Sequence, residues 1–225
     1  MITNCSIDQE RFDILRECMG MCFSKEKPPR EFEWNVISNR AVVYSCGMIG
    51  REGENLAHCH DEDELELCKL LSSAVADIMA GEYMVDDEGT HPFSPFYVTA
   101  NEDDNVPEQI TEDLIRSAFG GLIYPPVEIL IEPLEEGTTW WKTIYTCAVS
   151  DWEHEEADPP YLGLWREVID WFGQQPEIHS PAFVRIGREA IRGEDGGSGC
   201  VFPRLAVGLS RKGSLVGIFT CVTHT

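Results

Sequence analysis

The sequence predicts an α+β fold, because stretches with helical spacing of apolar residues alternate with β-rich stretches along the chain. The helical spacing is clearest over residues 61–80. The strand signal is clearest after Gly199, where two β-rich runs flank a short Arg211-Lys212-Gly213 turn. Hydrophobic residues make up 43 % of the 225, enough to build a core. We expect one domain over residues 1–225, with a long acidic central insertion over about 50–160.

The first half of the chain is predicted to hold two helices and two strands. Ser6-Ile7-Asp8-Gln9 fits a capping box, and apolar residues at helical spacing follow it. Four acids open the second helix, where they suit the helix dipole, and Gly81 can cap its end. The expected elements, in order, are a helix over about 7–22, strands at 32–34 and 41–46, and a helix over 61–80.

The second half is predicted to contain more strands than helices. Residues 138–149 are rich in Trp, Thr, Tyr and Val, a composition that favours a strand. In a strand, Trp140 and Trp141 face opposite sides, one in the core and one half-exposed. The expected elements are strands at 96–100, 127–131 and 138–149, helices near 110–118 and 165–172, and strands at 183–186, 205–209 and 215–222.

The net charge of −23 is concentrated in one stretch of the chain. Residues 51–175 carry 29 acidic and five basic residues, whereas the two ends together are almost neutral. Nucleic acids and anionic membranes attract clustered Lys and Arg, so neither is an expected partner. A field of this size can steer a basic protein toward the chain, although single acidic runs are also ordinary solvated surface.

Nine cysteines without framework spacing predict free thiols and a cytoplasmic protein. The start of the chain has no signal-peptide pattern, and no apolar run approaches the ~20 residues of a membrane span. Phosphate-loop, nucleophile-elbow and metalloprotease motifs are absent from the sequence, so we expect neither a cofactor nor catalysis. A cysteine nucleophile with a histidine base stays open, because such partners meet only in the fold.

One cluster suggests a metal site of this chain's own. His58-Cys59-His60, with Cys68 further on, offers the residue types that zinc prefers. No second Cys or His pair accompanies the cluster, and the segment leads directly into a helix that His60 or Asp61 can cap. The sequence leaves metal binding by these four residues open.

Both ends of the chain carry ordered motifs. Residues 213–225, GSLVGIFTCVTHT, contain a turn glycine, a Leu-x-Gly-Ile core and a final Thr, and residues 181–187 follow the predicted helix near 165–172. At the other end stand, in order, Phe23-Ser24-Lys25-Glu26, Pro28-Pro29 and Phe32-Glu33-Trp34. In their order and spacing these segments resemble the nuclease A inhibitor family, proteins that inhibit a sugar-nonspecific nuclease: the first matches the family's C-terminal strand, the second the strand after its long helix, and the third its N-terminal segment.

The resemblance implies an α-β-α sandwich with a mainly antiparallel central sheet, and a binding function without catalysis. It implies that Glu26 offers its carboxylate to the divalent metal of the nuclease, which takes oxygen ligands, and that Thr225 supplies a terminal carboxylate. Lys25, Trp34 and His224 fall beside them on the implied partner-binding surface. His224 stands where the family pattern leads us to expect an acid, and residues 35–160 are longer than the family's middle.

Two other functions stay open beside a nuclease inhibitor. The first is an acidic binding module, of DNA-mimic or immunity type, for another basic partner. The second is an uncharacterised enzyme that uses a Cys or His side chain.

Overall fold

The computed structural model describes residues 3–16, 36–54, 57–58, 61–85, 90–101, 105–150, 158–187 and 200–224. Of residues 3, 4, 57, 58, 200 and 224 it describes the backbone alone. The elements are β1 (Thr3–Asn4), α1 (Gln9–Arg16), β2 (Ala41–Val43), β3 (Ile49–Arg51), β4 (Ala57–His58), α2 (Glu62–Ile78), β5 (Ser94–Val98), α3 (Glu112–Ala118), β6 (Ile129–Pro133), α4 (Thr139–Ser150), α5 (Pro160–Gln174), β7 (Ile178–Ile186), β8 (Cys200–Ser210) and β9 (Leu215–His224).

A five-stranded sheet organises the fold, with its strands in the order β5-β9-β8-β7-β6. Every neighbouring pair in this sheet is antiparallel. The predicted α+β class with a mainly antiparallel sheet is therefore confirmed. Residues of the central stretch supply both edge strands, β5 and β6, so this stretch and the C-terminal strands share one sheet.

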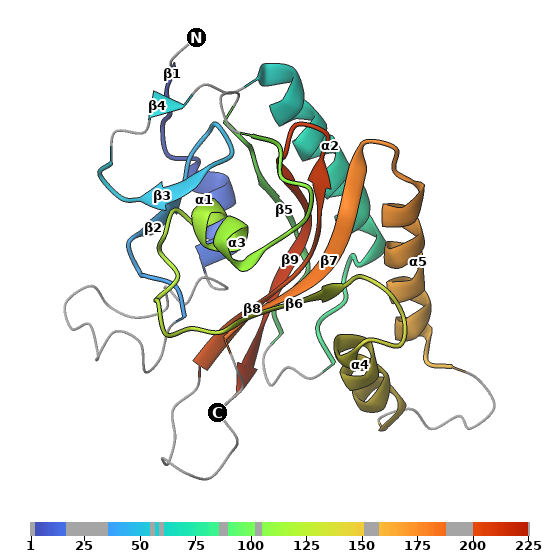
Figure 1. The fold of residues 1–225 in the computed structure, drawn as a ribbon. Coiled ribbons are helices and arrows are strands. Elements are labelled where there is room, and N and C mark those ends of the chain that lie inside the picture. The colour runs from blue at the N-terminus through green and yellow to red at the C-terminus, as the bar shows by residue number, and fades with distance from the viewer. Residues whose placement is uncertain are drawn as a thin grey trace.

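Helices lie on both faces of the sheet (Figure 1). On one face, α2 contacts β5 and β9, α5 contacts β7, and α4 contacts α5. The aromatic core beneath these helices contains Trp140 of α4, which stacks on Phe183 of β7 at 4.5 Å between ring centroids. On the other face, Phe119 at the end of α3 stacks on Phe96 of β5 at 5.8 Å. These two aromatic layers hold the helices against the sheet.

The helix α2 begins where the sequence predicts it. The carboxylate of Asp61 accepts hydrogen bonds from the backbone N–H groups of Asp63, at 2.9 Å, and Glu64, at 3.4 Å. The first helix differs in its cap, because Asp8 rather than Ser6 accepts from the backbone of Arg11, at 3.1 Å. The predicted capping box is therefore wrong, and α1 starts at Gln9.

The predicted strand at 138–149 is wrong, because Thr139–Ser150 forms the helix α4. Trp140 and Trp141 are both buried, whereas the strand that the sequence predicted would leave one of them half-exposed. The β-branched residues fit the helix because Thr143 and Thr146 donate their hydroxyls to backbone carbonyls four residues earlier, at 3.1 and 2.8 Å. Packing of the two indoles against the sheet overrides the local strand preference.

The other predicted elements are found with shifted ends. The predicted strand at 41–46 is the shorter β2, which pairs with β3 as a hairpin, and the predicted helix at 7–22 is described only as far as Arg16. The predicted strand at 32–34 lies outside the described residues. No helix within the described part of the chain has the length and apolar character needed to cross a membrane.

Candidate functional site

Most of the predicted partner-binding residues lie outside the described part of the chain. These are Lys25, Glu26, Trp34 and Thr225. His224 is described by its backbone, which ends β9 and pairs with Cys200 of β8. The structure therefore places one end of the predicted surface, at the end of the sheet where β8 begins and β9 finishes.

Hydrogen bonds with His91 hold the last part of β9, in addition to its pairing with neighbouring strands. His91, which precedes β5, lies 3.0 Å through its Nε2 from the hydroxyl of Thr223, and its carbonyl accepts from the Thr220 hydroxyl at 2.8 Å. β9 also pairs with β5 on one side and with β8 on the other. The backbone that leads to His224 is thus fixed by three neighbouring segments.

Two residues of the suspected metal cluster, His58 and Cys68, fall within the described part of the chain. His58 lies in β4, whose backbone pairs with Thr3. Cys68 is fully buried on α2, whereas Cys59 and His60 lie outside the described residues. Within the described ranges, no group of three or more His, Cys, Asp or Glu side chains is placed to hold a metal ion. Asp61 caps α2, which is the alternative role that the sequence offered.

Two of the described thiols, those of Cys46 and Cys68, are poor candidates for a nucleophile. Both cysteines are free and buried. Burial raises the pKa of Cys46 to about 12, and burial together with the nearby Glu64 carboxylate raises the pKa of Cys68 to about 12. At neutral pH both groups are therefore protonated thiols, whereas a nucleophile must be a thiolate.

A buried polar cluster joins α2 to the turn between β8 and β9. The Glu64 carboxylate, 5 % exposed, accepts from the hydroxyl of Ser210, which is 1 % exposed. The Ser210 hydroxyl in turn accepts from the backbone N–H groups of Lys212, at 3.2 Å, and Ser214, at 3.0 Å. The hydroxyl is thus fully hydrogen-bonded and closed to substrate, so the cluster fixes the turn rather than forming a serine nucleophile with a base.

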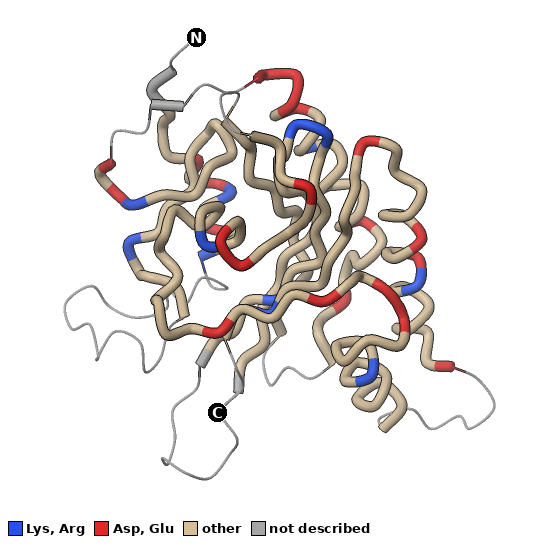
Figure 2. The backbone as a smooth tube through the Cα atoms, viewed as in Figure 1, with Lys and Arg blue, Asp and Glu red and all other residues tan. Residues whose placement is uncertain are grey.

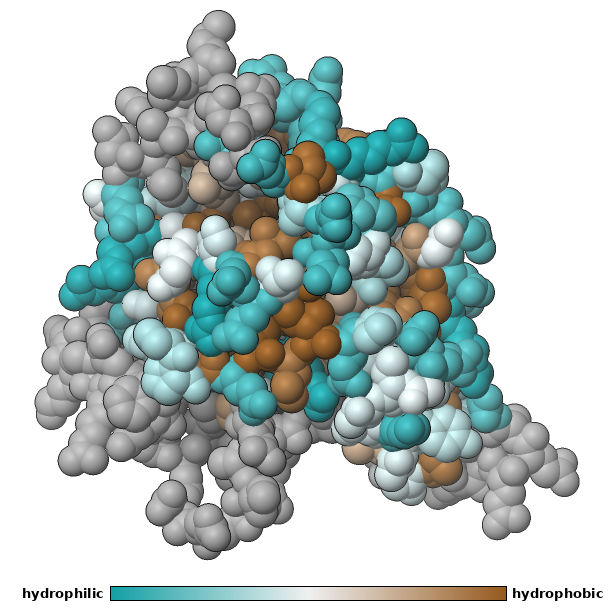
Figure 3. All heavy atoms as spheres, in the orientation of Figure 1, coloured by the Kyte–Doolittle hydropathy of each residue, from teal (hydrophilic) through white to brown (hydrophobic). Residues whose placement is uncertain are grey.

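Acidic side chains dominate the described surface. Figure 2 shows them at the start of α2, at the start of α3 and along α5, and Figure 3 shows hydrophilic residues over the same outer parts of α2 and α5. The exposed carboxylates at these places include Glu62, Asp63, Asp113, Glu167 and Asp170. The runs at 86–88, 102–104 and 151–157 lie outside the described residues.

Many basic side chains are already matched by an acid. Lys69 bonds to Glu66 at 2.7 Å, and Arg116 bonds to Glu112 at 2.8 Å. Further ion pairs join Arg166 to Glu136 and Asp158, Arg185 to Glu132, Arg211 to Glu177, and Lys212 to Asp61. These pairs leave the surface carboxylates of α2, α3 and α5 to set the sign of the potential.

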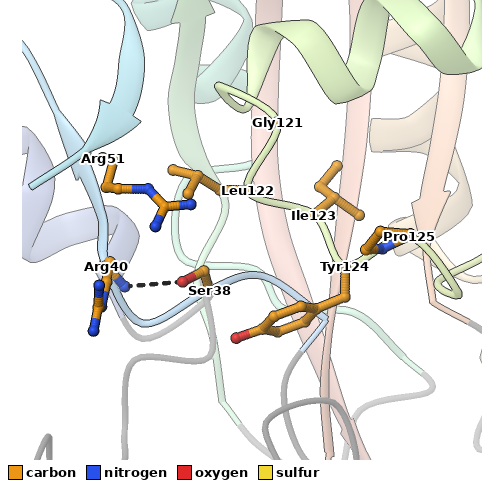
Figure 4. Close-up of a pocket in the computed structure, with 8 residues that line it drawn as sticks. All are labelled: Ser38, Arg40, Arg51, Gly121, Leu122, Ile123, Tyr124 and Pro125. Atoms are coloured by element: carbon orange, nitrogen blue, oxygen red, sulfur yellow. Dashed lines mark hydrogen bonds between the residues drawn. The ribbon is translucent and has the colours of Figure 1, made fainter. Parts of the chain in front are cut away.

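A pocket of about 360 Å³ opens between the β2–β3 hairpin and the segment after α3 (Figure 4). Its lining residues are Ser38, Arg40, Arg51, Gly121, Leu122, Ile123, Tyr124 and Pro125. The two arginines come from the hairpin side, and the segment after α3 contributes the half-buried Tyr124 and the exposed Pro125, whereas Leu122 and Ile123 are buried. No lining residue is acidic, which sets the pocket apart from the rest of the surface.

The sequence analysis missed this pocket. Arg40 precedes β2 and Arg51 ends β3, so the hairpin brings together two arginines that are separated along the chain. The far wall comes from a turn beyond α3. The signal in the sequence is slight: Arg40 directly precedes the predicted strand at 41–46, and Arg51 follows it by a few residues, in a chain with few basic residues.

No protein-family model matches this sequence, and a comparison with curated proteins finds no significant relative.

Proposed function

We propose that this chain is a protein inhibitor of a metal-dependent nuclease of the sugar-nonspecific type, and that it acts by binding alone. The observation that carries the proposal is the exposed carboxylate surface of α2, α3 and α5, in a chain of net charge −23. A nuclease that binds a polyanionic substrate needs a basic surface, and this inhibitor has the same sign of charge as that substrate. The field attracts the nuclease and orients it before contact.

The fold supports the contact with the nuclease that the resemblance implies. The resemblance implies that carboxylates of Glu26 and Thr225 occupy the active site of the nuclease. β9 is hydrogen-bonded on both sides through Phe219, and β8 continues the pairing to His224. A rigid strand that leads to the contact loses little conformational entropy on binding, which favours tight association.

The free thiols support a cytoplasmic location for this inhibitor. The described cysteines include the free and buried thiols of Cys46 and Cys68. Unpaired thiols of this kind persist in a reducing compartment.

An inhibition assay tests the proposal. The full chain is added to a purified sugar-nonspecific nuclease with Mg²⁺, and the rate of DNA hydrolysis is measured against inhibitor concentration. Loss of one partner of a buried, paired charge costs about 2 kcal/mol or more, so Glu26→Ala is expected to raise the inhibition constant about 30-fold or more. Deletion of Thr225 is expected to act in the same direction.

Glu135→Gln is the matched control, because Glu135 is an exposed loop acid with no side-chain partner among the described residues. It removes the same charge and is expected to change the constant less than twofold. Inhibition that survives both the Glu26 and the Thr225 changes would remove the proposed mechanism. Absence of inhibition at all concentrations, with salt-sensitive binding to another basic protein, would favour the acidic binding module instead.

A further inference from the structure

Two cations line the pocket between the β2–β3 hairpin and the segment after α3. Arg40 and Arg51 both line it, and both side chains are exposed. Arg40 has no carboxylate partner within the described ranges. Arg51 has a loose one, because its Nε lies 3.8 Å from Glu54. The two guanidinium groups therefore keep hydrogen-bond donors for another acceptor.

The contrast with the other basic side chains makes this arrangement informative. Elsewhere in the described structure, exposed or half-buried cations such as Lys69, Arg116 and Arg185 lie within 3 Å of a carboxylate oxygen. With 40 acidic residues in the chain, a carboxylate partner is easily supplied. Arg16 and Lys142 are also exposed without a carboxylate partner among the described residues, so what distinguishes Arg40 and Arg51 is that both line one cavity with no acidic lining residue.

The walls of the pocket are held in place without a ligand. The Ser38 N–H donates to the Leu122 carbonyl at 2.9 Å, and the Tyr124 N–H donates to the Val36 carbonyl at 3.1 Å. Arg116 supports the far wall from behind, because its guanidinium donates to the carbonyls of Tyr124, at 3.3 Å, and Val127, at 2.5 Å. A pocket whose walls are already fixed binds its ligand with little loss of entropy.

The two sides of the pocket differ in chemistry. Figure 4 shows Arg40 and Arg51 on one side, with Tyr124 and Pro125 on the other, and the Leu122 side chain beside Arg51. The hydroxyl of Tyr124 is directed toward the side of Ser38. Guanidinium groups recognise carboxylate and phosphate oxygens, and the ring of Tyr124 with Pro125 suits a flat hydrocarbon or aromatic body.

We propose that this pocket binds a small molecule that carries an oxyanion, a carboxylate or a phosphate, on an apolar or aromatic body. The oxyanion accepts from Arg40 and Arg51, and the body packs on Tyr124 and Pro125. The volume of about 360 Å³ lies within the range of small-ligand sites. Glu54 is the carboxylate placed near this site, 3.8 Å from Arg51, whereas acids beyond the Debye length of about 8 Å act weakly there at physiological salt. The inference is independent of the proposed nuclease target.

Titration of the ¹⁵N-labelled full chain by NMR tests the proposal. The probes are phenyl phosphate, benzoate and the neutral benzyl alcohol, each at constant ionic strength. We expect the two anions to give saturable shifts at the amides of Gly121, Leu122 and Ile123, and benzyl alcohol to bind at least tenfold more weakly. The anion that binds more tightly identifies the oxyanion as phosphate or carboxylate.

Arg40→Gln and Arg51→Gln are each expected to weaken anion binding about tenfold or more, because each removes charge-assisted hydrogen bonds. Arg40→Lys is expected to keep part of the affinity, since it keeps the charge and loses the planar fork. Lys142→Gln is the matched control, because it removes one positive charge from an exposed position on α4, and it is expected to change affinity less than twofold.

Three results would overturn the proposal. Unsaturated shifts for both anions would show that the pocket has no affinity of its own. Equal binding of benzyl alcohol would show that the arginines do not recognise the ligand. An equal loss in Lys142→Gln and the arginine variants would show a response to net charge alone. The circular dichroism spectrum of each variant is compared with that of the unchanged chain, so that a loss of binding is read only from folded protein.

Discussion

Two consecutive glycines after α3 offer a matched pair of substitutions. Gly120 and Gly121 both adopt positive φ, at +61° and +67°. A Cβ added at Gly120 would lie 2.7 Å from the carbonyl oxygen of Ile49, in the backbone of β3, whereas a Cβ added at Gly121 would meet nothing within 4 Å. Gly120→Ala and Gly121→Ala therefore share the conformational strain and differ in the steric clash.

The two costs can be estimated separately. An alanine in the left-handed region costs about 1–2 kcal/mol, and the smaller entropy of the unfolded chain returns about 0.4–1 kcal/mol. Gly121→Ala is thus expected to lower the free energy of unfolding by about 1 kcal/mol. Overpacking against backbone adds about 1–3 kcal/mol, so Gly120→Ala is expected to lose about 2–4 kcal/mol. The difference between the variants measures how closely the end of α3 packs on the hairpin.

Urea unfolding followed by circular dichroism measures this difference. With a slope of about 2 kcal/mol per molar, the midpoint is expected to fall by about 0.5 M in Gly121→Ala and by about 1–2 M in Gly120→Ala. The slope itself is expected to stay unchanged, because neither change alters the area exposed on unfolding. Equal midpoints in the two variants would refute the close approach of Gly120 to β3, and with it the fixed wall of the pocket.

Three further outcomes are expected. Trp140→Phe keeps the stacking on Phe183 but loses the donor to the Pro133 carbonyl at 2.9 Å, so it is expected to cost about 1–2 kcal/mol in urea unfolding, against about 3–5 for Trp140→Ala. A hydrogen bond from Lys212 holds the pKa of Asp61 in the folded chain below its usual value. The ionised Asp61 therefore stabilises the folded state fully above the unfolded pKa of about 3.9, and this stabilisation is lost as pH falls through the lower folded pKa. Asp61→Asn, which can still cap α2, is expected to show a smaller fall of urea midpoint between pH 6 and pH 3; an unchanged fall would contradict this. Iodoacetamide at pH 8 is expected to leave Cys46 and Cys68 unlabelled in the folded chain, with mass spectrometry after digestion as the measurement and labelling at the rate of a free thiol as the contrary result.

The parts of the fold that the sequence predicted correctly share a physical cause. In α5, Trp165, Val168 and Phe172 recur at helical spacing and are all buried. In α2, the same spacing is joined by a capping aspartate at Asp61. Burial of one face is what stabilises a surface helix, so periodicity predicts it even where element ends shift by a few residues.

The prediction from local composition was wrong where a tertiary contact determines the structure. Trp140 is 1 % exposed, stacks on Phe183 and donates to the carbonyl of Pro133, and none of these contacts is visible in the local sequence. Strand preference largely measures how a side chain fits its neighbours. The burial of the Trp140 indole between α4 and the sheet therefore outweighs the strand preference of the local sequence. The sequence did not predict the pocket for a related reason. Its two walls are far apart in the sequence and are joined by long-range hydrogen bonds such as that from Ser38 to Leu122.

The position of β9 within the sheet has a consequence for biosynthesis. β5 pairs with no described strand except β9. Val98 therefore cannot pair with Leu215 until Leu215 has left the ribosome. At about 5–20 residues per second, this delay is on the order of 10 s. During that time, the apolar residues Phe96, Tyr97 and Val98 have no partner strand, and a nascent chain in this state is open to chaperones and to aggregation. Folding of the sheet is therefore expected to finish after translation, and slowly, because its closing contact is also one of its longest in sequence.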